Sequence, residues 1–225
     1  MSPFGISRKL RNFVNNHLQT QALEFLPLYS ESLDGHFINQ AVEALRNGEI
    51  IICPTDTLYA LACNALNQRA IERLCQIKGL NPDKNYLSVV CSDISQASEY
   101  ARIDNRAFQI LREYLPGPFT FILPASSKLP KVFKGRKTVG VRIPDSAVAR
   151  ALAEALGNPL LTTSVDPYDD SDPDGVVNPE LIAEKYENDA SVLIDAGEGR
   201  SVPSTVVDLT DSANPQVVRQ GLGEL

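Results

Sequence analysis

The sequence alternates short apolar runs with segments that have the three-to-four-residue spacing of an amphipathic helix. This alternation constrains the fold most, because strands and helices that take turns along a chain build α/β domains. The expected helices cover residues 36–47, 67–78, 104–115, 146–156 and 179–186. The expected strands cover residues 49–53, 86–91, 119–123, 139–143, 160–163, 192–195, 205–209 and 216–219. The sequence therefore predicts an α/β fold with a mixed sheet.

The start of the chain differs from the rest. The first 23 residues contain basic residues and no acidic one, and an apolar helical face is formed there by Ile6, Leu10, Phe13 and Val14. A docking helix and a transit peptide both fit this pattern. We therefore expect an N-terminal extension over residues 1–33 and one domain over residues 34–225.

Cysteine and histidine content excludes several classes of site. The four cysteines are scattered without a Cys-x-x-Cys pair, which is typical of buried thiols in a reducing compartment. There is no secretory signal and no apolar run that could cross a membrane, so a cytoplasmic protein without a membrane partner is expected. With only two histidines, neither a histidine-based metal site nor a Ser-His-Asp triad is expected.

Charge is unevenly distributed along the chain. The net charge is −7, yet residues 128–142 hold six basic residues and no acidic one. Residues 166–198 hold eleven acidic residues and one basic residue. A basic segment in an acidic protein predicts an anionic ligand such as a phosphate or RNA, and the alternative is a solvated loop. The candidate RNA-binding residues are Lys128, Lys131, Lys134, Arg136 and Lys137.

Common nucleotide and hydrolase motifs are absent: no complete P-loop, dinucleotide fingerprint or Gly-x-Ser-x-Gly elbow occurs. Five polar motifs lie instead at strand ends, where hydroxyls and arginines hold carboxylates and phosphates. They read Thr-Asp-Thr-Leu-Tyr at 55–59, Pro-Gly-Pro-Phe-Thr at 116–120, Gly-Val-Arg-Ile-Pro at 140–144, Ser-Thr-Val-Val-Asp at 204–208 and Val-Val-Arg-Gln-Gly at 217–221.

In this order and spacing the motifs resemble the YrdC/YciO superfamily, over residues 37–223. The YciO branch is the most similar, because the first motif continues as Tyr59-Ala60-Leu61. The resemblance implies a twisted open mixed sheet with flanking helices and a basic concave groove. It also implies L-threonylcarbamoyladenylate synthesis from ATP, threonine and bicarbonate, with Mg²⁺, in the pathway that modifies tRNA adenosine. Members bind tRNA and double-stranded RNA.

The resemblance also assigns roles to residues. The implied nucleotide contacts are Lys78, Asn85, Thr120, Arg142, Ser164 and Arg219. The implied substrate contacts are Thr55, Tyr59 and Ser204. Other roles remain open: Thr55 in a turn, Lys78 at a helix end, and the two arginines in ion pairs with the acidic segment.

Four positions depart from the family pattern. Leu80 stands where the family has the arginine of Lys-x-Arg, Asp166 where it has an asparagine, Val90 where it has a histidine and Ala60 where it has a glycine. Three functions therefore stay open: a synthase or a threonylcarbamoyl-transfer relative, a non-catalytic RNA-binding paralogue, and a nucleotide-binding protein without RNA.

Overall fold

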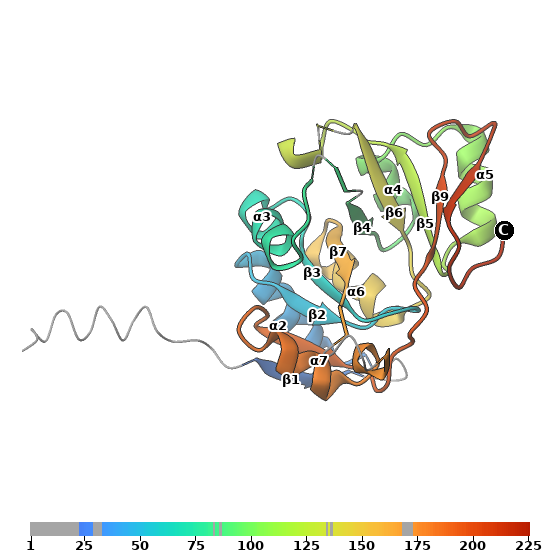
Figure 1. The fold of residues 1–225 in the computed structure, drawn as a ribbon. Coiled ribbons are helices and arrows are strands. Elements are labelled where there is room, and N and C mark those ends of the chain that lie inside the picture. The colour runs from blue at the N-terminus through green and yellow to red at the C-terminus, as the bar shows by residue number, and fades with distance from the viewer. Residues whose placement is uncertain are drawn as a thin grey trace, which may run out of the picture.

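The computed structural model describes residues 23–28, 33–82, 84–85, 87–133, 135, 137–167 and 173–225. In this part of the chain one sheet runs through the molecule and helices pack against it (Figure 1). The docking helix or transit peptide expected over the first 23 residues lies almost wholly outside the described residues, and stays a prediction.

The elements follow the alternation that the sequence predicts. The helices are α2 (Gly35–Arg46), α3 (Gln68–Ile77), α4 (Ile94–Tyr100), α5 (Asn105–Tyr114), α6 (Ala147–Leu156) and α7 (Pro179–Tyr186), with short 3-10 helices η1 (Lys131–Phe133) and η2 (Pro173–Val176). The strands are β1 (Glu24–Pro27), β2 (Ile51–Cys53), β3 (Ala60–Asn64), β4 (Ser88–Val90), β5 (Phe119–Pro124), β6 (Thr138–Arg142), β7 (Leu160–Ser164), β8 (Val192–Asp195), β9 (Thr205–Asp208) and β10 (Gln216–Arg219).

Within the described residues, ten strands form a single sheet in the order β1-β8-β2-β3-β7-β4-β6-β5-β9-β10. Four neighbouring pairs are parallel, namely β1–β8, β2–β8, β4–β6 and β5–β9, and the other five are antiparallel. The predicted α/β fold with an open mixed sheet is thus confirmed.

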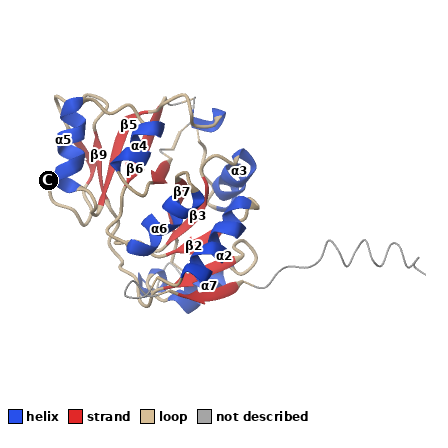
Figure 2. Ribbon diagram, turned by 180° about the vertical axis from the view of Figure 1, so that it is seen from behind, coloured by secondary structure: helices blue, strands red, loops and turns tan. Residues whose placement is uncertain are grey.

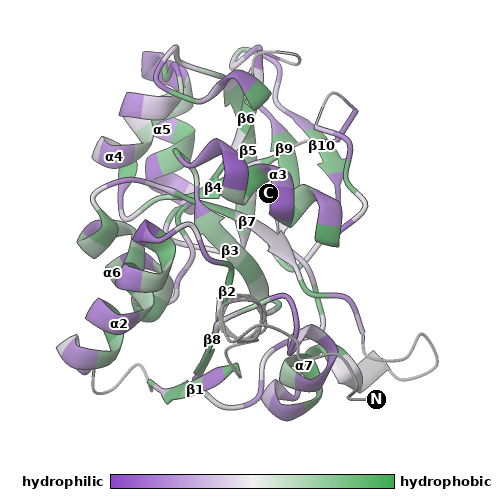
Figure 3. Ribbon diagram, turned by 90° about the vertical axis from the view of Figure 1, so that its left-hand side faces the viewer, coloured by the Kyte–Doolittle hydropathy of each residue, from purple (hydrophilic) through white to green (hydrophobic). Residues whose placement is uncertain are grey.

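Apolar clusters cover both faces of the sheet around β2 and β3. Along β2, Ile50 and Ile52 belong to one apolar cluster and Ile51 and Cys53 to another, as expected when successive side chains point to opposite faces. Helices α2 and α6 pack in the cluster of Ile51, and Figure 2 shows both in front of β2 and β3. Helices α3 and α7 contribute to the other cluster and lie on the opposite side of β2 and β3 in Figure 3.

Two strands and one α-helix were not foreseen, nor were the two short 3-10 helices. Strand β3 consists largely of alanine and cysteine, which give no β-type pattern. Helix α4 has only seven residues, too few for a clear helical period. Strand β1 lies in the expected N-terminal extension, yet it pairs in parallel with β8, with Leu26 opposite Ile194.

The four cysteines are buried and free, as the sequence predicts. Burial raises the pKa of the Cys53 thiol to about 12, so this thiol stays protonated at neutral pH. No helix in the described part of the chain is both long and apolar enough to cross a membrane.

One buried ion pair crosses the sheet. Arg142 on β6 donates to Oδ1 of Asp56 at 2.8 Å and to the hydroxyl of Thr57 at 3.0 Å. The other carboxylate oxygen of Asp56 accepts the N–H of Asp145 at 3.0 Å. Both charged side chains are less than a tenth exposed. The loop after β2 is therefore fixed to the end of β6 by charge and hydrogen bonds together.

Replacing Asp56 by asparagine tests this contact. The variant leaves a buried guanidinium without its counter-charge, so we expect the free energy of unfolding to fall by about 3 kcal/mol. Urea unfolding measures it. The matched control is Glu43→Gln, because Glu43 forms an exposed pair with Arg46 at 3.8 Å and should cost less than about 0.5 kcal/mol. Equal losses in the two variants would contradict the structural role of Asp56.

Candidate functional site

A cavity of about 300 Å³ lies over the middle of the sheet. Residues that are paired across neighbouring strands form a line beneath it. Thr162 is opposite Ser88, Ser88 is opposite Gly140, and Gly140 is opposite Ile122. Three of these residues line the cavity, namely Thr162, Ser88 and Ile122. The cavity thus rests on four adjacent strands, β7, β4, β6 and β5.

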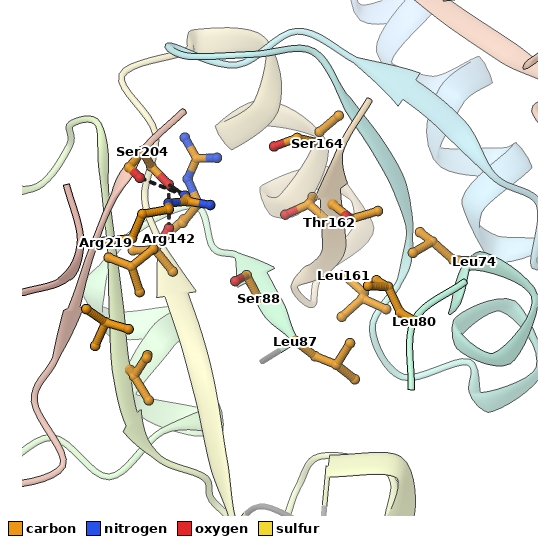
Figure 4. A pocket seen from close by; sticks show the side chains of 16 residues that line it. Leu74, Leu80, Leu87, Ser88, Arg142, Leu161, Thr162, Ser164, Ser204 and Arg219 are labelled. Atoms are coloured by element: carbon orange, nitrogen blue, oxygen red, sulfur yellow. Dashed lines mark hydrogen bonds between the residues drawn. The ribbon is translucent and has the colours of Figure 1, made fainter. Parts of the chain in front are cut away.

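The cavity has a polar and an apolar side. Figure 4 shows Arg142, Arg219 and Ser204 together on one side, across the cavity from the leucines. The polar lining is Ser88, Thr120, Arg142, Thr162, Thr163, Ser164, Ser204 and Arg219. The apolar lining includes Leu74, Leu80, Leu87 and Leu161. Such a lining fits an amphipathic ligand with an apolar part and an anionic part.

Two guanidinium groups meet on the polar side. Burial lowers the pKa of Arg142, and the nearby charge of Arg219 lowers it further, against the effect of Asp56. The Nε–H of Arg142 is buried without a hydrogen-bond partner. Arg219 on β10 donates to the carbonyl of Ser204 at 2.7 Å, and partial burial lowers its pKa. An unpaired donor beside two like charges favours binding of an anion.

Hydroxyls lie beside the arginines. The Thr120 and Ser204 hydroxyls are 2.8 Å apart, and both are buried. A Cβ at Gly140 would lie 2.6 Å from the Ser88 Oγ, so glycine is needed there for the Ser88 hydroxyl to stay at the cavity. These groups can donate to or accept from a ligand oxygen.

The C-terminal segment holds Arg219 in place. The N–H of Gly221 donates to the Thr205 hydroxyl at 2.9 Å, and the N–H of Leu222 donates to the carbonyl of Pro203 at 2.8 Å. A side chain at position 221 would collide with that carbonyl. The Arg-x-Gly motif therefore combines a cationic donor with a close backbone approach.

Lys78 lies at the C-terminal end of α3, behind Ser164. Its ammonium donates to the Ser164 carbonyl at 2.8 Å and forms an ion pair with Asp166 at 2.5 Å. The Lys78 side chain is only 7% exposed. The lysine therefore has a carboxylate partner at the position where the family pattern has an asparagine.

Four implied contacts do not line the cavity: Lys78, Thr55, Tyr59 and Asn85. The Thr55 hydroxyl donates to the Leu58 carbonyl at 2.7 Å and accepts the N–H of Thr57, within a turn. The Tyr59 hydroxyl donates to the Gly197 carbonyl at 2.7 Å. The Asn85 side chain accepts the N–H of Asn81 at 2.9 Å. The other five implied contacts line the cavity: Thr120, Arg142, Ser164, Ser204 and Arg219.

The basic segment is only partly described, because Lys134 and Arg136 lie outside the described residues. Lys128 forms an exposed ion pair with Glu99 at 2.7 Å, and the hydrogen bond to this carboxylate raises its pKa. Lys131 lies in η1. Lys137 has a positive φ of 59° and lines a separate hollow with Arg102. RNA binding at this segment therefore stays a prediction.

The departures from the family pattern lie in different places. Leu80 and Ala60 line the cavity. Val90 is fully buried in the core on β4. Asp166 is the partner of Lys78. Two of the four departures thus change the cavity wall itself.

Some residues of the site carried no sequence signal. Ser88 and Thr162 come together only through the pairing of β4 with β7, which the sequence does not reveal. Asp56 stands inside the first motif, but its partner was not foreseen. Among the described residues, no group of three or more His, Cys, Asp or Glu could hold a metal ion.

Comparison with known proteins identifies the family to which the chain is similar. The family model for Sua5, YciO and YrdC, with the description "Telomere recombination", matches residues 43–221. YciO of Escherichia coli K12 is 38% identical over 208 residues, covering 90% of this chain and 97% of YciO. The threonylcarbamoyl-AMP synthase of Pyrococcus abyssi is 32% identical, covering 85% of this chain and 56% of the synthase.

Two of the most similar solved structures in this comparison come from the same family. The crystal structure of E. coli YciO has a TM-score of 0.82 and 37% identity, covering 90% of this chain and 97% of that one. The crystal structure of P. abyssi Sua5 complexed with L-threonine has a TM-score of 0.77 and 30% identity, covering 88% of this chain and 57% of that one. The chain belongs to the Sua5/YciO/YrdC family.

Proposed function

We propose that the cavity binds a nucleotide, and that the protein acts in the chemistry of threonylcarbamoyl-AMP. The observation that carries this proposal is the pair of guanidiniums from Arg142 and Arg219 beside the hydroxyls of Thr120 and Ser204. Guanidiniums and hydroxyls are the groups that hold phosphate and carboxylate oxygens. The leucines opposite offer an apolar surface for a base.

Within that chemistry the substrates are ATP, threonine and bicarbonate, with pyrophosphate as a product. The P. abyssi structure with threonine supports threonine as the amino acid. Arg219 would neutralise charge on the phosphate, and Arg142, which also lines the cavity, would add a second guanidinium beside the ligand. Positioning and charge stabilisation suffice for transfer at a phosphorus atom, without a covalent nucleophile.

Mg²⁺ would enter this site with the nucleotide, as a partner of its phosphates. The described residues lack a cluster of metal ligands, so this donor set does not fit a metal held by the protein. We therefore assign no step to a protein-bound Mg²⁺.

The alternative is a paralogue that binds a nucleotide or RNA without synthase turnover, or a threonylcarbamoyl-transfer relative. Leu80 favours it, because an aliphatic side chain in the cavity wall cannot replace an arginine that donates to phosphate. The Lys78–Asp166 pair favours it too, because this lysine already has a counter-charge.

Nucleotide binding is tested by thermal unfolding with AMP, ATP, threonine and tRNA added separately. A nucleotide at about 100 times its Kd should raise Tm by about 5 °C or more. Arg219→Gln should weaken nucleotide binding at least about tenfold, because it removes a charge-assisted hydrogen bond. The matched control is Arg112→Gln, on the exposed face of α5. Equal binding by the two variants would contradict the role of Arg219.

Synthase turnover is tested by pyrophosphate release with ATP, threonine and bicarbonate together. Because Leu80 and the paired Lys78 reduce the charge available to phosphates, we expect release at least about tenfold slower than by the P. abyssi synthase. Omitting threonine should abolish it. Pyrophosphate release no faster than in buffer alone would contradict synthase activity and favour the alternative function.

RNA binding is tested with duplex RNA and tRNA at several salt concentrations. Replacing Lys134, Arg136 and Lys137 by alanine together should weaken binding and lower the slope of log Kd against log salt by about 2. The control is a triple alanine variant of Arg46, Arg73 and Arg112, which carries the same charge change. A flat salt response of the unaltered protein would contradict RNA binding through phosphates.

A further inference from the structure

Lys78 and Asp166 form an ion pair beside the cavity. Ser164 lines the cavity, and its carbonyl accepts from the same ammonium that contacts Asp166. Two of the three donors of Lys78 are thus used within the protein. Since the side chain is 7% exposed, water competes little for this lysine.

Asp166 is itself held in place. Its backbone N–H donates to the Tyr186 hydroxyl at 3.0 Å, and that hydroxyl is 3.3 Å from the second carboxylate oxygen. Burial raises the pKa of Tyr186 to about 12, so the hydroxyl keeps its proton at neutral pH. Tyr186 is 4% exposed and comes from α7. The Asp166 side chain is 55% exposed, and each of its carboxylate oxygens has one partner within the protein.

The cavity consequently offers little free positive charge. Arg142 is offset by Asp56, and Lys78 by Asp166. Lys78 lies beside the lining and not in it, so Arg219 is the second lining cation after Arg142, and no described carboxylate forms an ion pair with Arg219. Leu80 adds apolar surface where a further cation would help a polyphosphate. Each additional negative charge of a ligand would enter without a counter-charge.

We propose that Asp166, by neutralising Lys78, makes the cavity select a nucleotide with a single phosphorus atom over a triphosphate. Nucleoside monophosphates and acyl adenylates are the ligands with this chemistry. The inference rests on the proposed nucleotide binding, and it makes Asp166 a specificity-determining residue outside the cavity lining.

The test compares the affinities of AMP and ATP by calorimetry without divalent metal. We expect the unaltered protein to bind AMP at least about tenfold more tightly than ATP, which corresponds to about 1.4 kcal/mol. Asp166→Asn frees the ammonium of Lys78, so ATP should bind about tenfold more tightly while AMP changes by less than about threefold. Leu80→Arg, which adds a cation to the apolar side of the cavity, should also tighten the binding of ATP more than that of AMP.

The matched control is Glu43→Gln, which removes one negative charge from an exposed ion pair on α2. It should leave the ratio of the two affinities unchanged. Tighter binding of ATP than AMP by the unaltered protein, or an unchanged ratio in Asp166→Asn, would overturn this inference and leave nucleotide binding intact. Binding of neither nucleotide would overturn both.

Discussion

The ion pair between Asp56 and Arg142 is the contact on which the site depends. In the sheet, β2 and β6 are separated by β3, β7 and β4, so the pair joins positions that are neighbours in neither sequence nor sheet order. The loop after β2 must therefore reach across these strands to meet β6. The ion pair therefore holds the motif at 55–59 against the motif at 140–144, beside the cavity.

The same ion pair separates two properties of Arg142, namely its net charge and its capacity to donate hydrogen bonds. Asp56 cancels the net charge of Arg142 but leaves its Nε–H without a partner. With Asp56 as its counter-charge, this guanidinium adds little net attraction for an anion. In Lys78 both properties are taken up, because Asp166 offsets its charge and its donors are largely used inside the protein. Arg219, on an edge strand, supplies net charge as well as donors.

Much of the fold was predictable because its helices and strands have strong local patterns. Helices α2, α3, α5, α6 and α7 carry apolar faces and capping residues, such as Asn67 before α3 and Gly157 after α6. Strand β3 escaped prediction because alanine and cysteine have no β-type pattern, although all of its residues except Asn64 are buried. Here tertiary pairing outweighs propensity.

The site was predictable only in part. The motifs at strand ends contain Thr120, Arg142, Ser204 and Arg219, and the family resemblance adds Ser164; all five residues line the cavity. They could not identify Ser88 and Thr162, which meet through the register of β4 and β7. Nor could they show that Asp166 reaches Lys78, because 88 positions of sequence separate the two residues and only the folded sheet brings them together.

Strand β1 is part of the sheet, although it lies in the expected N-terminal extension. Its parallel pairing with β8 means that residues 24–27 supply hydrogen bonds to a strand that is otherwise flanked only by β2. Leu26 and Leu28 fill the core beneath α2. A shortened chain starting at residue 34 would leave the N–H and C=O groups of β8 open along one side, and such an edge is a template for pairing with another chain. In the full chain β1 takes this edge position, and its Pro27 has no N–H to donate to a further strand.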